Sequence, residues 1–195
     1  MRKILLVLLL LFTFNTAALA ATETSVIGRP ISGTTMQGLV PEVDGISNAN
    51  IRASVNGILK SKAEELGKKA GKGSTVNYEV VFNQTDIFSI ILFAENGDNK
   101  LYSGVNIDVS AGKELDNSAI VRDGNAVKKL TGATEVILAD GGLRYKAQTT
   151  GAYSEFISYA KILPYINISN AERIMRLHRV TNAAFGSVIT INAGE

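Results

Sequence analysis

The chain has 195 residues, no cysteine, and 20 basic against 18 acidic side chains. This length is enough for one domain with a substantial core, and the near balance of charge gives no reason to expect a nucleic-acid partner, which calls for a basic patch. The lack of cysteine excludes disulfides, cysteine zinc sites and thiol catalysis.

The first twenty residues have the three parts of a secretory signal peptide. Arg2 and Lys3 give a positive start, and residues 4–12 form an unbroken apolar run. The residues at the expected cleavage point are Ala18, Ala20 and Ala21. The pattern predicts cleavage after Ala20 and export to the periplasm or beyond. An uncleaved N-terminal anchor is the alternative, but the apolar run is shorter than the about 20 residues of a spanning helix.

The remainder of the chain is predicted to be neutral and without a membrane span. Removal of Arg2 and Lys3 leaves 18 basic and 18 acidic side chains, and no later segment is long and apolar enough to cross a bilayer. Residues 21–35 are small and polar and predict a flexible N-terminal arm. A single domain is predicted over 36–195, with no linker long enough to divide it.

A long amphipathic helix is the clearest predicted element. Ser47 or Asn48 can cap its start, and Gly71 and Gly73 end it. Its apolar positions recur at three- and four-residue spacing: Ile51, Val55, Ile58, Leu59, Ala63 and Leu66. These positions share one face, which we expect to pack on a sheet.

The hydrophobic period then changes to that of strands. Residues 76–82, 88–94 and 101–109 predict three strands, and the Asn96-Gly97 pair predicts a hairpin turn between the last two. In the stretch 101–109, Val105 and Ile107 share one face, and Tyr102, Asn106 and Asp108 share the other. The alternation predicts one buried and one wet face.

The second half predicts shorter elements. They are a helix over 118–130 interrupted at Asp123-Gly124, a hairpin of 134–139 and 143–147, a strand over 155–162, a helix opened by the capping box at 169–172, and a strand over 188–191. The fold class predicted is α+β, with a long amphipathic helix packed on an antiparallel sheet and a smaller C-terminal helix. A nucleotide-binding α/β fold is not expected, because strands and helices do not alternate with Gly-rich loops.

Five short motifs follow one another between residues 41 and 115. They are Pro41-x-Val43-x-Gly45-Ile46, Val55-Asn56, Tyr78-x-Val80, Ile87-x-Ser89-Ile90, and Asn106-x-Asp108-x-x-x-Gly112-Lys113-x-Leu115. Their order resembles an extracytoplasmic domain of unknown function found at the N-terminus of certain peptidoglycan deacetylases, and the ectodomain of a lysozyme-sensing anti-sigma factor. The resemblance implies an envelope location. The Gly-Gly-Ala-His segment usual in that family is absent, and the chain has Asn96-Gly97-Asp98-Asn99 instead.

No catalytic or metal-binding set stands out in the sequence. His178, the only histidine, is predicted to lie on the C-terminal helix as a surface residue, without the Gly-x-Ser-x-Gly motif of a hydrolase. The candidate acid and base carboxyls are Glu42, Asp44, Glu95, Asp98, Asp108 and Glu114. Most are expected to be surface acids, and Asp108 is expected to anchor the turn before Gly112. The segment Asn96–Asn99 contains only fragments of a calcium loop, so no metal and no cofactor is predicted.

Aromatic residues supply the candidate ligand surface. Tyr102, Tyr145 and Tyr153 are the tyrosines predicted to face outward, where aromatic rings can stack on sugars; core packing is the alternative. Arg173, Arg176 and Arg179 form a basic stripe, which is more typical of a solvated helix face than of a binding surface.

Three functions agree with these observations. The first is a non-enzymatic envelope domain that binds a wall component such as peptidoglycan, or a protein partner. The alternative is a secreted hydrolase or inhibitor acting on cell-wall glycans, and a purely structural secreted protein is the third. The oligomeric state is not predicted.

Overall fold

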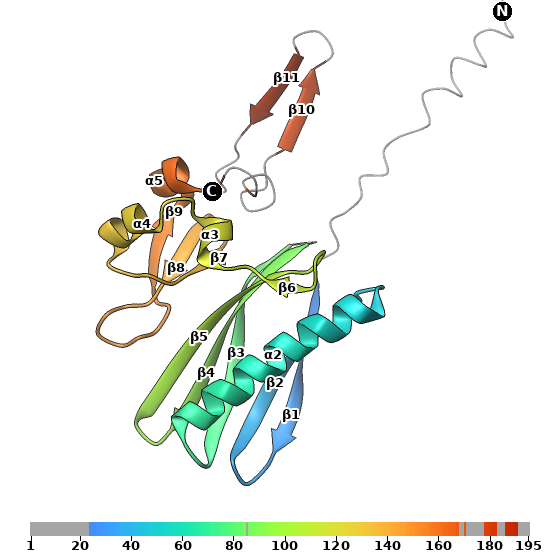
Figure 1. Ribbon diagram of the computed structural model, residues 1–195, viewed down its shortest axis with the longest axis vertical. Coiled ribbons are helices and arrows are strands. Elements are labelled where there is room, and N and C mark those ends of the chain that lie inside the picture. The colour runs from blue at the N-terminus through green and yellow to red at the C-terminus, as the bar shows by residue number, and fades with distance from the viewer. Residues whose placement is uncertain (1–23, 85, 168–169, 171–177, 183–185, 191–195) are drawn as a thin grey trace, which may run out of the picture.

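A computed structural model describes residues 24–84, 86–167, 170, 178–182 and 186–190. Its larger part is a six-stranded sheet with one long helix on one face (Figure 1). The elements in chain order are β1 (Ser25–Ser32), β2 (Met36–Asp44), α2 (Ala49–Ala70), β3 (Ser74–Asn83), β4 (Ile87–Asn96), β5 (Asn99–Asp108) and β6 (Lys113–Glu114). The predicted signal peptide and its cleavage point lie outside the described residues.

Helix α2 begins and ends where the sequence predicts. The Asn48 side chain accepts hydrogen bonds from the backbone N–H groups of Asn50 and Ile51 at 3.0 and 3.2 Å. The N–H of Gly71 closes the last turn on the carbonyl of Gly67 at 3.2 Å. Both ends of the helix therefore satisfy backbone groups that would otherwise lack partners.

The large sheet is antiparallel except between β2 and β3. All other neighbouring strands run in opposite directions, whereas Met36–Gly38 pairs in parallel with Ser74–Val76. Helix α2 connects these two parallel strands, as a crossover requires. Gly38 has a φ of +117° and lies directly against the Val76 backbone. The predicted antiparallel sheet is thus a mixed sheet.

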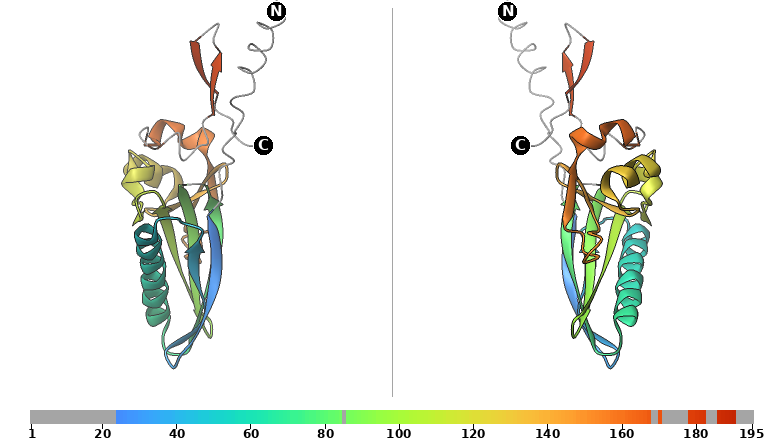
Figure 2. Two further views of the ribbon diagram at one scale, coloured as in Figure 1. Left: turned by 90° about the vertical axis from the view of Figure 1, so that its right-hand side faces the viewer. Right: turned by 90° about the vertical axis from the view of Figure 1, so that its left-hand side faces the viewer.

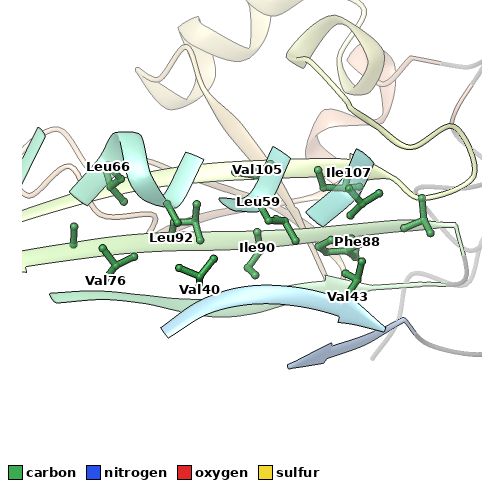
Figure 3. Close-up of a cluster of buried hydrophobic side chains, with 14 of the residues drawn as sticks. Val40, Val43, Leu59, Leu66, Val76, Phe88, Ile90, Leu92, Val105 and Ile107 are labelled. Atoms are coloured by element: carbon green, nitrogen blue, oxygen red, sulfur yellow. The ribbon is translucent and has the colours of Figure 1, made fainter. Parts of the chain in front are cut away.

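The main core lies between α2 and the sheet (Figure 3). Val55, Leu59 and Ala63 of the helix are fully buried against Phe88 and Ile90 of β4. The alternate residues Ile87 and Ile91 of β4 are also buried, on the opposite face. Residues 87–94 of β4 are apolar apart from the buried Ser89, because both faces of this part of the strand are covered.

A second, smaller part of the chain packs against one end of the opposite face (Figure 2). It comprises α3 (Asn117–Ile120), α4 (Gly124–Thr131), β7 (Val136–Ala139), β8 (Gly142–Tyr145), β9 (Glu155–Ser158), α5 (Tyr159–Ile162) and the 3₁₀ turn η1 (Leu163–Tyr165). Strands β7, β8 and β9 form a three-stranded antiparallel sheet. A separate hairpin pairs β10 (His178–Asn182) with β11 (Gly186–Thr190). The architecture is α+β, as predicted.

The second layer corrects the prediction that β5 has one wet face. Asn106 and Asp108 are 5% and 6% exposed, because β7 packs over that end of the strand. A polar residue in a strand pattern can contact either water or another protein layer, so the pattern alone does not tell these two cases apart.

Other predictions about secondary structure also change. Residues 25–32 do not form a flexible arm, because β1 pairs with β2 along its whole length. The predicted strand 155–162 is a strand only to Ser158 and then turns into α5. His178 does not lie on a helix but begins β10. The capping box at 169–172 and the stripe residues Arg173 and Arg176 fall largely outside the described residues.

No helix among the described residues is both long enough and apolar enough to span a membrane.

Candidate functional site

A groove of about 440 Å³ runs beside β5, between α2 and the segment that follows β8. Ligand sites in proteins commonly have volumes of about 300–1,000 Å³. The lining residues come from four segments: Lys62, Glu65, Leu66 and Lys69 of α2, residues 100–103 of β5, Glu135 before β7, and Lys146, Thr150 and Gly151 after β8. The groove is therefore assembled from both parts of the fold.

The floor of the groove is an edge of the large sheet. Strand β6 pairs with β5 only at Ile107 and Asp108, so within the described part of the chain no strand covers β5 from Asn99 to Asn106 on that side. An uncovered edge presents backbone N–H and C=O groups that another chain can pair with.

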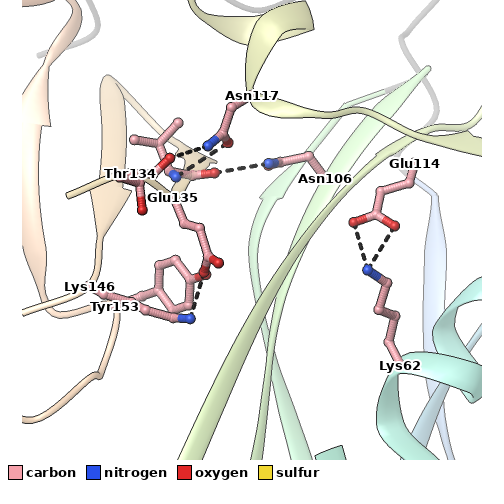
Figure 4. A network of polar contacts seen from close by, with 9 residues as sticks. Lys62, Asn106, Glu114, Asn117, Thr134, Glu135, Lys146 and Tyr153 are labelled. Atoms are coloured by element: carbon pink, nitrogen blue, oxygen red, sulfur yellow. Dashed lines mark hydrogen bonds and ion pairs between the residues drawn. The ribbon is translucent and has the colours of Figure 1, made fainter. Parts of the chain in front are cut away.

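Tyr153 closes one end of this edge. The residue is 5% exposed, and its hydroxyl faces the backbone N–H of Gly104. A side chain at Gly104 would collide with the ring, since an added Cβ would lie 2.8 Å from Cζ of Tyr153. The same hydroxyl donates to Oε2 of Glu135 at 3.1 Å (Figure 4). Tyr153 thus links β5 to the wall of the groove.

Four lysines line the groove, and each has a carboxylate neighbour. The Nζ atom of Lys62 lies 3.0 Å from Glu114, that of Lys69 lies 2.7 Å from Glu65, and that of Lys146 lies 2.6 Å from Glu135. Lys100 pairs with Glu95 and also lies over the rings of Phe93 and Tyr102. Of these carboxylates only Glu65 and Glu135 line the groove itself, so lysines outnumber carboxylates among its lining residues.

Glu135, Tyr153 and Lys100 at the groove have shifted pKa values. The hydrogen bond from Lys146 lowers the pKa of Glu135 below its ordinary value, with a smaller contribution from Tyr153. Burial raises the pKa of Tyr153, and the negative charge of Glu135 raises it further. The hydrogen bond with Glu95 raises the pKa of Lys100. Near neutral pH Glu135 is therefore ionised, and Tyr153 and Lys100 are protonated donors, an arrangement suited to binding.

Two asparagines fix β7, and with it the Glu135 wall. Asn106 donates to the carbonyl of Val136 at 3.1 Å and accepts from the N–H of Leu138 at 2.9 Å. Asn117 donates to the carbonyl of Thr134 and accepts from the N–H of Val136 at 3.4 Å (Figure 4). The two side chains act as substitutes for a neighbouring strand along the outer edge of β7.

The structure separates the three tyrosines of the predicted ligand surface. Tyr102 lies at the groove and is partly exposed. Tyr153 is next to it but faces inward, so its predicted outward orientation is wrong. Tyr145 packs against the second core, formed around Leu138 and Leu143. Only Tyr102 offers a ring to a ligand in the groove.

The candidate carboxyls have different partners and do not form a pair. Glu42 is ion-paired with Arg29 at 2.8 Å, and Asp44 accepts from the N–H of Gly45 at 2.8 Å. Glu95 and Glu114 hold the groove lysines, and Asp98 lies in the turn between β4 and β5. Asp108 accepts from Ser110 and from the N–H of Ala111, which confirms its predicted role in anchoring the turn.

The segment Asn96–Asn99 is the predicted hairpin turn. Residues Asn96 and Asn99 pair with each other across the end of β4 and β5. The Asn96 side chain donates to the carbonyls of Ala70 and Lys72 at the end of α2. Among the described residues no group of His, Asp and Glu is arranged to hold a metal ion.

The sequence reasoning did not identify the groove lysines or Glu135. Lys62, Glu65 and Lys69 are spaced three and four residues apart and so share one face of α2, which is a signal in the sequence. Lys100, Glu135 and Lys146 come from other elements. Their meeting depends on how the second layer packs on the first.

Comparison with solved structures supports the fold. The structure resembles that of a member of the DUF3298 family from Bacteroides fragilis, with a TM-score of 0.53 and 9% sequence identity, over 80% of this chain and 98% of that chain. A DUF3298 family protein from Pseudomonas aeruginosa aligns with a TM-score of 0.39 and 14% identity, over 76% of this chain and 94% of that chain. No family model and no curated protein matches the chain.

The first of these likenesses shows a shared fold. Neither structure is described as a peptidoglycan deacetylase or an anti-sigma factor, so that part of the resemblance stays a prediction.

Proposed function

We propose that this chain is an exported, non-enzymatic domain of the cell envelope that binds an anionic component of that envelope in the groove beside β5. Four lysines from three separate segments converge on this groove, and this convergence carries the proposal. Export is supported by the signal-like residues 1–20 and by the pattern of small residues before Ala21.

The ligand is held by charge and hydrogen bonds. Lys69 and Lys100 are the most accessible of the four lysines, with side chains 65% and 44% exposed. An incoming carboxylate or phosphate can contact these ammonium groups while they remain paired with Glu65 and Glu95. The ammonium groups stay largely solvated in such a contact. Each such contact is modest because solvent screens it, so binding needs several lysines acting together.

A hydrolase acting on wall glycans is the alternative function. Such an enzyme needs a carboxylic acid whose pKa is raised, opposite a second carboxylate. The carboxyls that line the groove are Glu65 and Glu135, and hydrogen bonds from Lys69 and Lys146 lower their pKa values. The geometry therefore favours binding. Turnover of a wall glycan that disappears in Glu135→Gln would overturn the proposal.

A pelleting assay with intact peptidoglycan sacculi tests the proposal. The chain starting at Ala21 is expected to pellet with sacculi at low salt and less at physiological salt, because salt screens the lysines. The double variant Lys69→Gln, Lys100→Gln should lose most of this pelleting. The matched control is Lys128→Gln, Lys129→Gln, which removes the same charge from exposed positions of α4, away from the groove. Equal losses in the two variants would contradict a role for the groove.

A further inference from the structure

Alternate residues of β5 turn their backbone groups toward the groove. The carbonyl of Asn106 accepts from the N–H of Leu115 on the β6 side at 2.8 Å, and the N–H of Gly104 points to Tyr153 on that same side. In a strand the backbone N–H and C=O groups change sides at every residue. Tyr102 and Lys100, two and four residues before Gly104, therefore direct their N–H and C=O groups into the groove.

Three other strands of this fold, β7, β2 and β1, carry residues that protect an edge. Asn106 and Asn117 occupy the outer edge of β7, and the Asn56 side chain occupies both backbone groups of Val43 on β2. Strand β1 carries Pro30, a residue that protects edges. On β5 the corresponding residue is Tyr153, whose hydroxyl faces the backbone N–H of Gly104.

Lysines stand on both walls beside this edge. Lys62 and Lys69 stand on the α2 side, and Lys146 stands on the opposite side. A second copy of β5 would bring its own Lys100 and the surrounding lysines against the same walls, so pairing between copies is opposed by like charges. An acidic strand would meet complementary charge.

We propose that the groove binds an extended acidic peptide, which adds to the large sheet as a strand on β5 opposite Lys100 and Tyr102. Backbone hydrogen bonds supply affinity in this mode, and side chains of the peptide at alternate positions meet the lysines. Tyr153 sets the end of the binding site at Gly104. This inference rests on the proposed function, because it assigns the chemical class of the ligand to the same groove.

The probe for the test is the hexapeptide acetyl-Glu-Val-Glu-Val-Glu-Val-amide, paired with the same peptide methylated on alternate backbone nitrogens. The methylated peptide is made in two versions, which carry the methyl groups on one or on the other alternate set of backbone nitrogens. All the peptides carry equal charge, but each methylated version can form strand hydrogen bonds along only one of its edges. We expect one pattern to reduce the affinity about tenfold or more, as the loss of two hydrogen bonds predicts. Amide exchange at Lys100 and Tyr102, followed by NMR, should slow when the unmodified peptide binds.

Variants at Tyr102 test the hydrogen-bonding groups that β5 contributes to the pairing with the peptide. Tyr102→Pro removes an N–H that faces away from β4, where an edge strand tolerates proline. Tyr102→Thr removes the same ring but keeps the N–H. Loss of peptide binding in the proline variant with retention in the threonine variant supports strand addition.

Three results would overturn the inference. Equal binding of the unmodified peptide and both methylated peptides, still lost in Lys69→Gln, Lys100→Gln, would mean that the groove recognises charge alone. Unchanged exchange at Lys100 and Tyr102 would place the peptide elsewhere. Lysine-dependent pelleting with sacculi but no binding of any peptide would reject a peptide ligand and leave the proposed function standing.

Discussion

At the scale of single residues, asparagine side chains complete several strand edges of this molecule. Asn56 binds the N–H and C=O of Val43 at 2.8 and 3.2 Å, and Asn83 binds those of Thr24 at 3.1 and 2.8 Å. Asn106 does the same for β7 and is the most buried of the three. A primary amide has one acceptor and one donor side, so it can replace a residue of a neighbouring strand. The polar residues that appeared in the sequence motifs, Asn56 and Asn106, therefore have structural roles.

We predict that Asn106→Ala lowers the free energy of unfolding by about 3 kcal/mol. The substitution leaves the carbonyl of Val136, the N–H of Leu138 and the hydroxyl of Ser89 without their partner in a buried place, and each unsatisfied group costs about 1–3 kcal/mol. Urea unfolding measures the loss. Asn125→Ala, at an exposed position of α4, is the control and should change stability by less than about 0.5 kcal/mol.

The pair of Lys146 and Glu135 gives a prediction about pH. The pKa of Glu135 in the folded chain lies below the ordinary 4.5 because Lys146 donates to it. Its stabilising contribution is therefore present above pH 4.5 and is lost as the pH falls through the lower folded value. In Lys146→Met the pKa of Glu135 should rise, since burial then acts without its main opposing cause. A carboxyl ¹³C NMR titration measures this, and Lys128→Met should leave the Glu135 pKa unchanged.

At the scale of elements, the contact between β2 and β3 depends on one glycine. Gly38 has a positive φ, and an added Cβ would lie 2.1 Å from the carbonyl oxygen of Val76. The parallel pairing spans only Met36–Gly38 on β2 and Ser74–Val76 on β3. Separation of the backbones at this point would therefore disturb the connection of the β1–β2 hairpin to the rest of the sheet.

Two glycine-to-alanine substitutions should have opposite effects on stability. Gly38→Ala is expected to cost about 2 kcal/mol or more, through the positive φ and the collision with Val76. Gly57→Ala should stabilise the chain by about 0.5–1 kcal/mol, because Gly57 is exposed inside α2 and a Cβ there meets nothing within 4 Å. Thermal unfolding of both variants measures the difference. A stable Gly38→Ala variant would show that the two strands can part without loss.

At the scale of the whole molecule, two hydrophobic cores meet across the large sheet. The first lies between α2 and the sheet, and the second lies among β7–β9 and the short helices. A small cluster of Ile91, Ile137 and Tyr153 joins β4 to the second layer. The groove lies where these two parts adjoin, so its shape depends on this contact.

We predict that Ile137→Ala destabilises both parts together. Ile137 is fully buried, and its truncation should cost about 2–5 kcal/mol. Native-state hydrogen exchange should then show faster exchange at β4 as well as at β7, as expected when the two parts unfold as one cooperative unit. Faster exchange confined to residues 113–166 would instead mean that the second part opens by itself. Leu130→Ala, at an exposed position of α4, serves as the control.

Local signals predicted much of this structure. The caps of α2 at Asn48 and Gly71, the Asn96-Gly97 turn and the hairpin of β7 and β8 follow from side chains that act within a few residues of their own position. The strand β1 and the strand β10 at His178 were missed for the opposite reason. Their conformations depend on pairing with β2 and β11, and pairing partners leave little trace in a segment's own residues.

The sequence by itself therefore determined the fold class, the long helix and the three central strands, because hydrophobic period and capping act locally. Only the tertiary structure decided which face of β5 is dry, which tyrosine is exposed, and that Lys62, Lys69, Lys100 and Lys146 share a groove. Those properties arise from the packing of β7–β9 against the large sheet. Contacts between residues far apart in the chain are fixed by the complementary surfaces of the two layers, and no single segment encodes them.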